Sequence, residues 1–216
     1  MKVLSTLIIL GLTLQLNAQL IQDSDALELV RQLESKYNSY SSIEASFSIS
    51  MEIPEEDPIL QEGKLIQKGD NYFMETQAQT IYSDGNSMWL YLKDDNEVQI
   101  NDIDEDDEAS VVNLSPKGIL AMFDEDSYEY AITNKEGNIY YIEFKPIDPD
   151  SDFSKLRVTI DTKNQLLLES KVFYKDGIKY TMSVGEVIPN GIYHDDVFVF
   201  NADKFPGVYI EDLRFD

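Results

Sequence analysis

The sequence predicts a mainly β protein with a few helices, of the α+β class, built on one large curled antiparallel sheet. Two long regions, residues 47–100 and 128–189, consist of short apolar stretches separated by turns rich in Asn, Asp and Gly. Gaps this short favour antiparallel hairpins between neighbouring strands. Only two stretches have helical spacing, and a sheet of so many strands curls. We expect the two helices to lie on its concave side, where incomplete filling would leave a cavity.

A first helix is expected from Asp23 to about Tyr40, ended by the serines that follow. Ser24 or Asp25 is its expected N-cap, because short polar side chains bind the unpaired amides of a first turn. Helical spacing gives this helix one apolar stripe, which consists of Ala26, Val30, Leu33 and Tyr37.

The strands follow from period-two alternation. In the first of them, serines and a glutamate alternate with Phe47, Ile49, Met51 and Ile53. The same reasoning predicts strands at 63–68, 72–77, 79–83, 87–93 and 98–100, then at 128–133, 139–145, 155–161, 166–174 and 179–189. The final unit, residues 195–214, adds at most one more strand.

The stretch SDGNSMWLY, residues 83–91, departs from this alternation and contains the single tryptophan. Asp84-Gly85 reads as a tight turn, because glycine tolerates a positive φ. The residues after it, Met88 to Tyr91, are all apolar or aromatic, so both faces of this strand are expected to be covered. A second helix at 113–123, with Ser115 as cap and Pro116 at its first position, is the expected cover for one of them.

The N-terminal segment and the composition indicate an exported protein. Residues 1–18 read as a signal peptide cleaved after Ala18, with an uncleaved anchor as the alternative, and no later apolar run is long enough to span a membrane. The remainder, 19–216, has neither repeats nor a low-complexity linker and is expected to form a single domain. There is no cysteine, and the net charge of −24 becomes −25 when Lys2 is lost. Such a field repels nucleic acid and anionic membranes.

No motif for catalysis, metal or cofactor emerges. His194, the single histidine, precedes two aspartates, but no G-x-S-x-G elbow or cysteine nucleophile accompanies it. Acidic triplets at 102–106 and 148–152 have the D-x-D-x-D spacing of a calcium loop without its glycine. We interpret His194 as a surface residue and both triplets as solvated loops, with weak calcium binding as the alternative. The prediction is a protein that is not an enzyme and has no cofactor and no metal site.

Four stretches resemble the periplasmic outer-membrane lipoprotein carrier proteins, the LolA family. They are YSSIEASFSIS, GKLIQKGDNYFMET, SDGNSMWLYLKDDNEVQI and HDDVFVFNADKFPGVYIEDLR. They occur in the family's order over nearly the whole chain after the signal peptide. The resemblance implies a half-open β-barrel closed by a helical lid.

The resemblance also implies a periplasmic chaperone that shields lipoprotein acyl chains in a hydrophobic cavity and carries them from the inner to the outer membrane. Its implied partners are acylated lipoproteins, an ATP-driven release complex in the inner membrane and an outer-membrane acceptor, and the carrier is expected to be a monomer. The alternation and the family positions together predict the cavity lining: Phe47, Ile49, Leu65, Phe73, Trp89, Tyr91, Leu120, Met122 and Phe123.

One departure concerns the lid. The family commonly has Arg-Pro where this chain has Gly69-Asp70, and that arginine is thought to latch the lid. Lys68 is the nearest cation, so either Lys68 substitutes as the latch or the lid closes by apolar contacts. The acidic loop 101–108 is interpreted as solvated, with a partner-docking surface as the alternative. An exported lipid-binding sensor on the same fold is the alternative function, and a hydrolase using His194 is a third.

Overall fold

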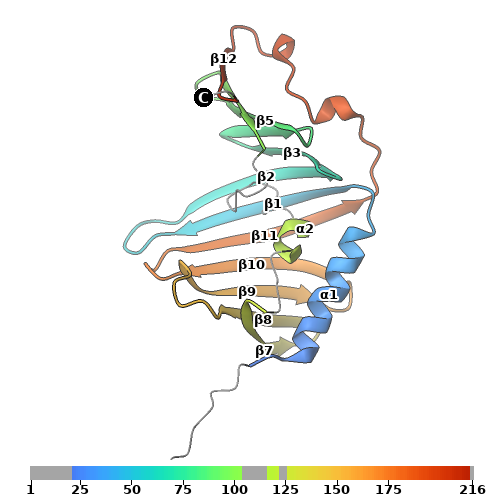
Figure 1. Cartoon of the computed structure of the whole chain (residues 1–216), viewed down its shortest axis with the longest axis vertical. Coiled ribbons are helices and arrows are strands. Elements are labelled where there is room, and N and C mark those ends of the chain that lie inside the picture. Colours follow the sequence, from blue (N-terminus) through green and yellow to red (C-terminus); the bar gives the residue numbers. More distant parts are fainter. Residues whose placement is uncertain (1–20, 104–115, 122–125, 215–216) are drawn as a thin grey trace, which may run out of the picture.

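The protein is described from a computed structural model, which describes residues 21–103, 116–121 and 126–214, the side chain of residue 121 excepted. Those residues form a twelve-stranded sheet with two α-helices on one of its faces (Figure 1). The prediction of a mainly β chain with a large sheet is confirmed. The sheet is open, because its two terminal strands, β12 and β7, do not pair with each other.

The strands agree with the predicted ranges to within a few residues through β11. In chain order they are β1 Ile43–Glu52, β2 Ile59–Lys68, β3 Asn71–Thr76, β4 Gln79–Ser83, β5 Ser87–Leu92, β6 Glu97–Asp102, β7 Tyr128–Glu136, β8 Ile139–Pro146, β9 Phe153–Asp161, β10 Leu166–Tyr174, β11 Lys179–Pro189 and β12 Tyr209–Asp212. The Asp84-Gly85 turn is also confirmed: Gly85 has φ +87°, and Asp84 Oδ1 accepts the amide of Ser87 at 2.9 Å.

The sheet order is β12-β6-β5-β4-β3-β2-β1-β11-β10-β9-β8-β7. Two meanders, β2–β6 and β7–β11, are thus joined through β1, which pairs with both β2 and β11. One part of the prediction was wrong, since the sheet is not antiparallel throughout. β12 pairs in parallel with β6, because the chain after β11 returns along the sheet through two 3₁₀ turns, Asp195–Val197 and Ala202–Lys204, instead of a tight hairpin.

Helix α1 spans Ser24–Asn38, and its N-cap lies one residue before the first of the two expected caps. Asp23 is the N-cap, and its carboxylate accepts the amides of Asp25 and Ala26, so the expectation of Ser24 or Asp25 was wrong. An N-cap needs extended backbone, which Asp23 has because it also pairs with the edge strand β7 through Tyr130 O at 3.0 Å. The predicted apolar stripe of α1 is buried.

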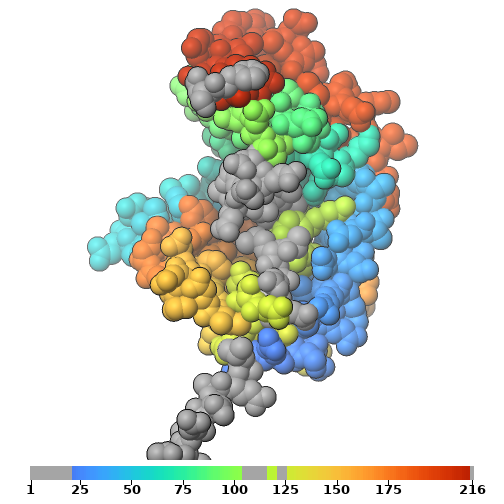
Figure 2. Space-filling view, in the orientation of Figure 1, coloured from blue at the N-terminus to red at the C-terminus, as the bar shows by residue number. Residues whose placement is uncertain are grey.

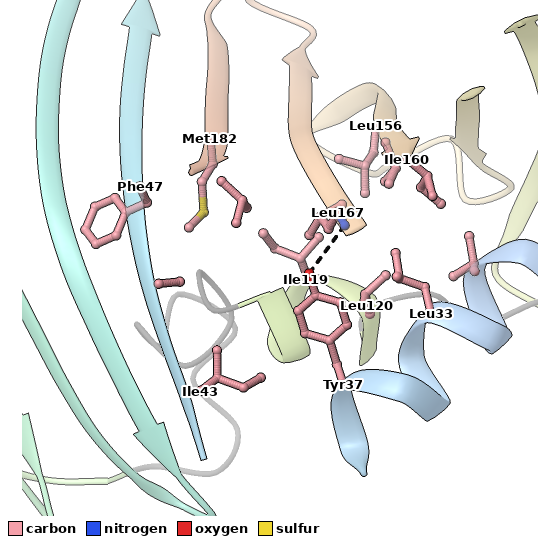
Figure 3. Packing of buried hydrophobic residues seen from close by; sticks show 14 of the residues in the cluster. Leu33, Tyr37, Ile43, Phe47, Ile119, Leu120, Leu156, Ile160, Leu167 and Met182 are labelled. Atoms are coloured by element: carbon pink, nitrogen blue, oxygen red, sulfur yellow. Dashed lines mark hydrogen bonds between the residues drawn. The ribbon is translucent and has the colours of Figure 1, made fainter. Parts of the chain in front are cut away.

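Helix α2, Pro116–Ala121, begins at the proline that was expected to open it. It packs beside α1 on the same face of the sheet, which we call the inner face, and Figure 3 shows the side chains that meet there. Ile119 and Leu120 of α2 join α1 and the strands in one hydrophobic core. Within it the Tyr37 hydroxyl accepts the Leu167 amide at 3.4 Å. Within the described residues, neither helix has the length and apolar character needed to cross a bilayer.

Candidate functional site

An apolar pocket of about 250 Å³ opens on the inner face at the end of the sheet far from α1. Strands β1 to β4 and β11 supply its walls, and the β1–β2 hairpin beside it projects from the body of the molecule (Figure 2). The lining consists of Ile49, Met51, Ile59, Gln61, Met74, Thr76, Gln79, Ile81 and Tyr180.

The pocket is a direct product of strand alternation. Met51 lies opposite Ile59 on one side and Tyr180 on the other, so one row of the sheet points three apolar side chains inward. Ile59 and Tyr180 remain 46% and 41% exposed, and they form the mouth. An exposed apolar mouth above a largely apolar floor is suited to a long hydrocarbon chain.

The floor of the pocket is the edge of the hydrophobic core. Met74 and Ile81 are each 4% exposed and also belong to the core under α1 and α2. Ile49 packs against that core and lines the pocket as well. The apolar residues of the inner face therefore run from the core into the pocket, interrupted there by Gln61, Thr76 and Gln79, and the two helices pack on the core.

The residues predicted to line the cavity divide between the two faces of the sheet. Phe47, Leu65 and Leu120 are buried in the core of the inner face, with Ile49 at its edge. Phe73, Trp89 and Tyr91 lie on the opposite, outer face, as the pairing of Phe73 with Tyr82 and of Tyr82 with Trp89 shows. Neighbours in a strand point to opposite faces, so these three residues do not share a space with the other four. Met122 and Phe123 lie outside the described residues.

The C-terminal segment, residues 190–208, covers the outer face where β3 to β5 present their aromatic residues. Phe200 stacks on Phe205 with ring centroids 4.9 Å apart. The ring centroid of Phe200 also lies 5.8 Å from that of Tyr82 and 5.8 Å from that of Tyr91. Both faces of the Met88–Tyr91 stretch are covered, as expected: Met88 and Leu90 pack against the core, and the C-terminal segment covers Tyr91.

Lys68 holds the same C-terminal segment. Its Nζ lies 2.8 Å from Asp195 Oδ1 and 3.1 Å from Tyr193 O, and this ion pair lowers the pKa of Asp195. Glu44 provides a second link between the sheet and the C-terminal segment. Its carboxylate forms an ion pair with Lys64 and accepts a hydrogen bond from the Tyr193 hydroxyl. Burial and the bond to Glu44 raise the pKa of Tyr193 to about 12. The contacts of Lys68 thus fasten the C-terminal segment to the outer face, on the side of the sheet away from α2.

The other chemical candidates stay apart from the pocket. His194 is exposed at the start of a 3₁₀ turn, and the adjacent Asp195 carboxylate is bound by Lys68. Asp148 accepts the amide of Asp150 at 2.8 Å, which makes that acidic triplet a turn. The triplet at 102–106 lies mostly outside the described residues. Within the part of the chain that the structure describes, no three acidic or histidine side chains are grouped as a metal site.

A wider groove of about 780 Å³ runs along the exposed side of α1. Its lining is polar apart from Leu27, and it includes Glu28, Arg31 and Lys36. An acyl chain lying there would take charged groups such as Glu28, Arg31 and Lys36 out of water, which costs free energy, so this groove is a poorer site for an acyl chain. The smaller pocket remains the better candidate.

Sequence reasoning missed most of the pocket. Of its lining only Ile49 was predicted, although the alternation Phe47-Ile49-Met51 already pointed to Met51. The residues from other strands depend on pairing, which a strand's own pattern does not specify. Those missed are Met51, Ile59, Gln61, Met74, Thr76, Gln79, Ile81 and Tyr180.

Comparison with known proteins adds a family match. The model of the family described as outer membrane lipoprotein carrier protein LolA matches residues 38–201. An outer-membrane lipoprotein carrier protein from Wigglesworthia glossinidia brevipalpis is 31% identical over 135 residues, which cover 61% of this chain and 59% of that protein. The match thus spans less than two thirds of that relative.

The chain also matches solved structures of low sequence identity. An uncharacterized conserved protein from Thermus thermophilus is 8% identical, with a TM-score of 0.55 over 87% of this chain and 99% of the other. A LolA superfamily protein from Nitrosomonas europaea is 12% identical, with a TM-score of 0.42 over 81% and 97%. At these identities the first supports the fold alone.

Proposed function

Because its family model matches residues 38–201, this chain belongs to the LolA family of outer membrane lipoprotein carrier proteins, and we propose that it is itself an exported lipoprotein carrier. It binds the acyl chains of lipoproteins on its inner face and carries them from the inner to the outer membrane. The observation that carries this proposal is the open apolar pocket between β1, β2 and β11.

The physical case rests on the cost of exposing hydrocarbon to water. Each methylene left in water costs about 0.8 kcal/mol, so an acylated protein needs an apolar shelter to cross an aqueous space. The pocket offers Met51, Ile59 and Tyr180 at its mouth and leads to a floor continuous with the core. A chain that enters there meets mainly apolar side chains.

The proposal includes the surroundings that such a carrier needs. Residues 1–18 would direct export and be removed after Ala18, and residues 19–216 would act as one carrier domain in the periplasm, as a monomer. An ATP-driven release complex in the inner membrane would deliver the lipoprotein, and an outer-membrane acceptor would receive it. The proposal contains no catalytic step.

The site assignment is revised to follow the sheet. We propose that Ile49 and its pocket neighbours contact the acyl chains first. The core residues Phe47, Leu65 and Leu120 become accessible only if α1 or α2 moves. For the outer-face residues Phe73, Trp89 and Tyr91, contact with the C-terminal segment is the better-supported role.

A cysteine-label experiment tests the pocket, since the chain contains no cysteine of its own. Met51→Cys carries an environment-sensitive fluorophore on the inner face, and Ser50→Cys carries it one residue away on the outer face. Each labelled protein is titrated with a triacylated lipopeptide and with the same peptide lacking its acyl chains. We expect a saturable blue shift from the label at position 51 with the acylated peptide only.

The label at position 50 is the control for the fluorescence change at position 51. Equal shifts from positions 50 and 51 would indicate non-specific adsorption and contradict the pocket assignment. No shift from either, in folded protein free of co-purified lipid, would contradict acyl binding here. Saturable binding without transfer to acceptor membranes would favour the lipid-binding sensor over the carrier.

A further inference from the structure

Four cations gather on the outer face of β9, β10 and β11, of which β11 also lines the pocket on the opposite face. We call Lys155, Arg157, Lys171 and Lys179, together with Phe173 among them, the cationic patch. Arg157 lies opposite Lys171, and Phe173 lies opposite Lys155 and Lys179 on its two sides. Adjacent strands thus place these side chains on one surface.

The patch carries more positive than negative charge. Glu143 forms ion pairs with both Lys155 and Arg157. Glu52 forms ion pairs with both Lys171 and Lys179. Four cations against two carboxylates leave a local excess of +2. Glu169 lies two residues from Lys171 on the same strand, and counting it still leaves +1. Since the whole chain has a net charge of −24, this sign is opposite to that of the molecule around it.

The cations are also held in place. The ring centroid of Phe173 lies 4.7 Å from Lys155 Nζ, 5.7 Å from Lys171 Nζ and 5.5 Å from Arg157 Cζ. Long side chains fixed by an ion pair and an aromatic face lose little further entropy when they bind. Lys179 is the most exposed of the four, at 42% of its side chain, so the patch is both ordered and accessible.

We propose that the cationic patch is a docking surface for a short acidic segment of a protein partner. Charge complementarity requires a partner segment with negative charge. The short range of the electrostatic field requires that this segment be short. A peptide a few residues long senses charges within a Debye length of about 8 Å, where the excess is positive. An anionic bilayer extends over far more of the surface than a short peptide, and the net charge of −24 would repel it.

This inference goes beyond the proposed carrier function and does not depend on it, because the patch and the pocket lie on opposite faces of the sheet and share only β11. A partner docked on the outer face leaves the mouth of the pocket open. Acyl binding and peptide docking are therefore separable in experiment.

The test uses a fluorescein-labelled oligoglutamate peptide and the mature chain at about 0.15 M ionic strength, where the Debye length is about 8 Å. We expect a saturable rise in anisotropy, and the double variant Lys171→Gln, Lys179→Gln should bind about tenfold more weakly. The matched control, Lys163→Gln with Lys204→Gln, removes the same charge from exposed lysines outside the patch and should change affinity by less than about twofold. Equal losses in both variants would overturn the proposal, since the overall field would then explain the binding.

Two further measurements check the interpretation. Carbodiimide crosslinking of the peptide to the unaltered chain, read by mass spectrometry, should link Lys155, Lys171 or Lys179. Links confined to other lysines would contradict the proposal whether or not the variant folds. Vesicles of phosphatidylglycerol and phosphatidylcholine should not sediment with the chain. Vesicle binding that the double variant loses would instead assign the patch to a membrane.

Discussion

Phe47 and Gly63 face each other across β1 and β2, and this pair shows how closely the inner face is packed. A Cβ at position 63 would overlap the Phe47 ring and the carbonyl oxygen of Glu75. Glycine is ordinarily a weak strand residue because it loses the most backbone entropy on folding. Here the close approach of a neighbouring ring and backbone outweighs that cost.

We therefore expect Gly63→Ala to lower the free energy of unfolding by about 1 to 3 kcal/mol, as overpacked cores do. Urea denaturation followed by circular dichroism measures it. Glu62→Ala, next in the strand and pointing to the other face, is the control and should change stability little. A neutral or stabilised Gly63→Ala would mean that the ring moves aside at no cost.

For Trp89, the identity of the residue does not determine which face of the sheet it occupies. Its strand is apolar on both faces, so its own pattern does not say which face is inner. The pairing of Trp89 with Tyr82 assigns it to the outer face, while Leu90 pairs with Ile81 toward the core. A shift of one residue exchanges the two faces, and only the neighbouring strands fix the choice.

At the scale of the elements, Asp23 ties α1 to the edge of the sheet. Its Oδ1 caps the helix through the amides of Asp25 and Ala26, and its Oδ2 accepts the amide of Ile132 in β7 at 3.2 Å. The bond from Ile132 is the largest cause of the lowered pKa of Asp23, and the two cap bonds add to it. One carboxylate thus supports both the helix and its attachment.

Asp23→Ala should lower the free energy of unfolding by about 1 to 2 kcal/mol near neutral pH, the usual cost of a lost cap. Because the pKa of Asp23 is lower in the folded state, its contribution is present above the ordinary value of 3.8 and is lost as pH falls through the folded-state value. Denaturation curves of the variant and the parent should therefore converge on acidification below that range.

The control for this change is Asp25→Ala, which alters an exposed acid in the first turn of the same helix. It should cost less, since Asp25 contributes its charge near the helix N-terminus while Asp23 provides the cap. A difference between Asp23→Ala and its parent that stays constant with pH would contradict the role given to the ionised carboxylate.

The C-terminal segment is the element that the sequence pattern described least well. Its apolar residues suggested strand, yet Phe200 and Phe205 act as a stacked pair against Tyr91. Their place depends on a return of the chain across the outer face to a parallel edge strand. No local period encodes such a return.

For the whole molecule, the excess of acidic over basic residues is the dominant electrostatic feature. With 41 acidic and 17 basic residues, like charges repel across the surface and destabilise the compact state. Ion pairs such as Lys68 with Asp195 oppose this only weakly, because water and salt screen the attraction between exposed charges.

Added sodium chloride should therefore raise the thermal unfolding midpoint between low and moderate ionic strength. Screening shortens the range of the repulsion more than it weakens close pairs. Calorimetry of the mature chain across a salt series measures this, with sucrose as a control for effects that do not depend on charge. A midpoint that falls as salt is added would mean that the ion pairs outweigh the repulsion.

The sequence alone predicted the strand ranges through β11 and the two helices, because alternation, turn residues and helical spacing are local properties of the chain. The family was predicted separately, from the resemblance of four stretches to its known members. Only the tertiary structure decided which face each residue occupies. Phe73, Trp89 and Tyr91 moved to the outer face, while Met51, Ile59 and Tyr180 came together as a pocket mouth. The same holds for the cationic patch, whose members are separated in the chain and meet on three strands. The pairing and register of a strand depend on its contacts with both neighbouring strands. The pattern of one strand alone therefore does not determine which of its faces points to the core.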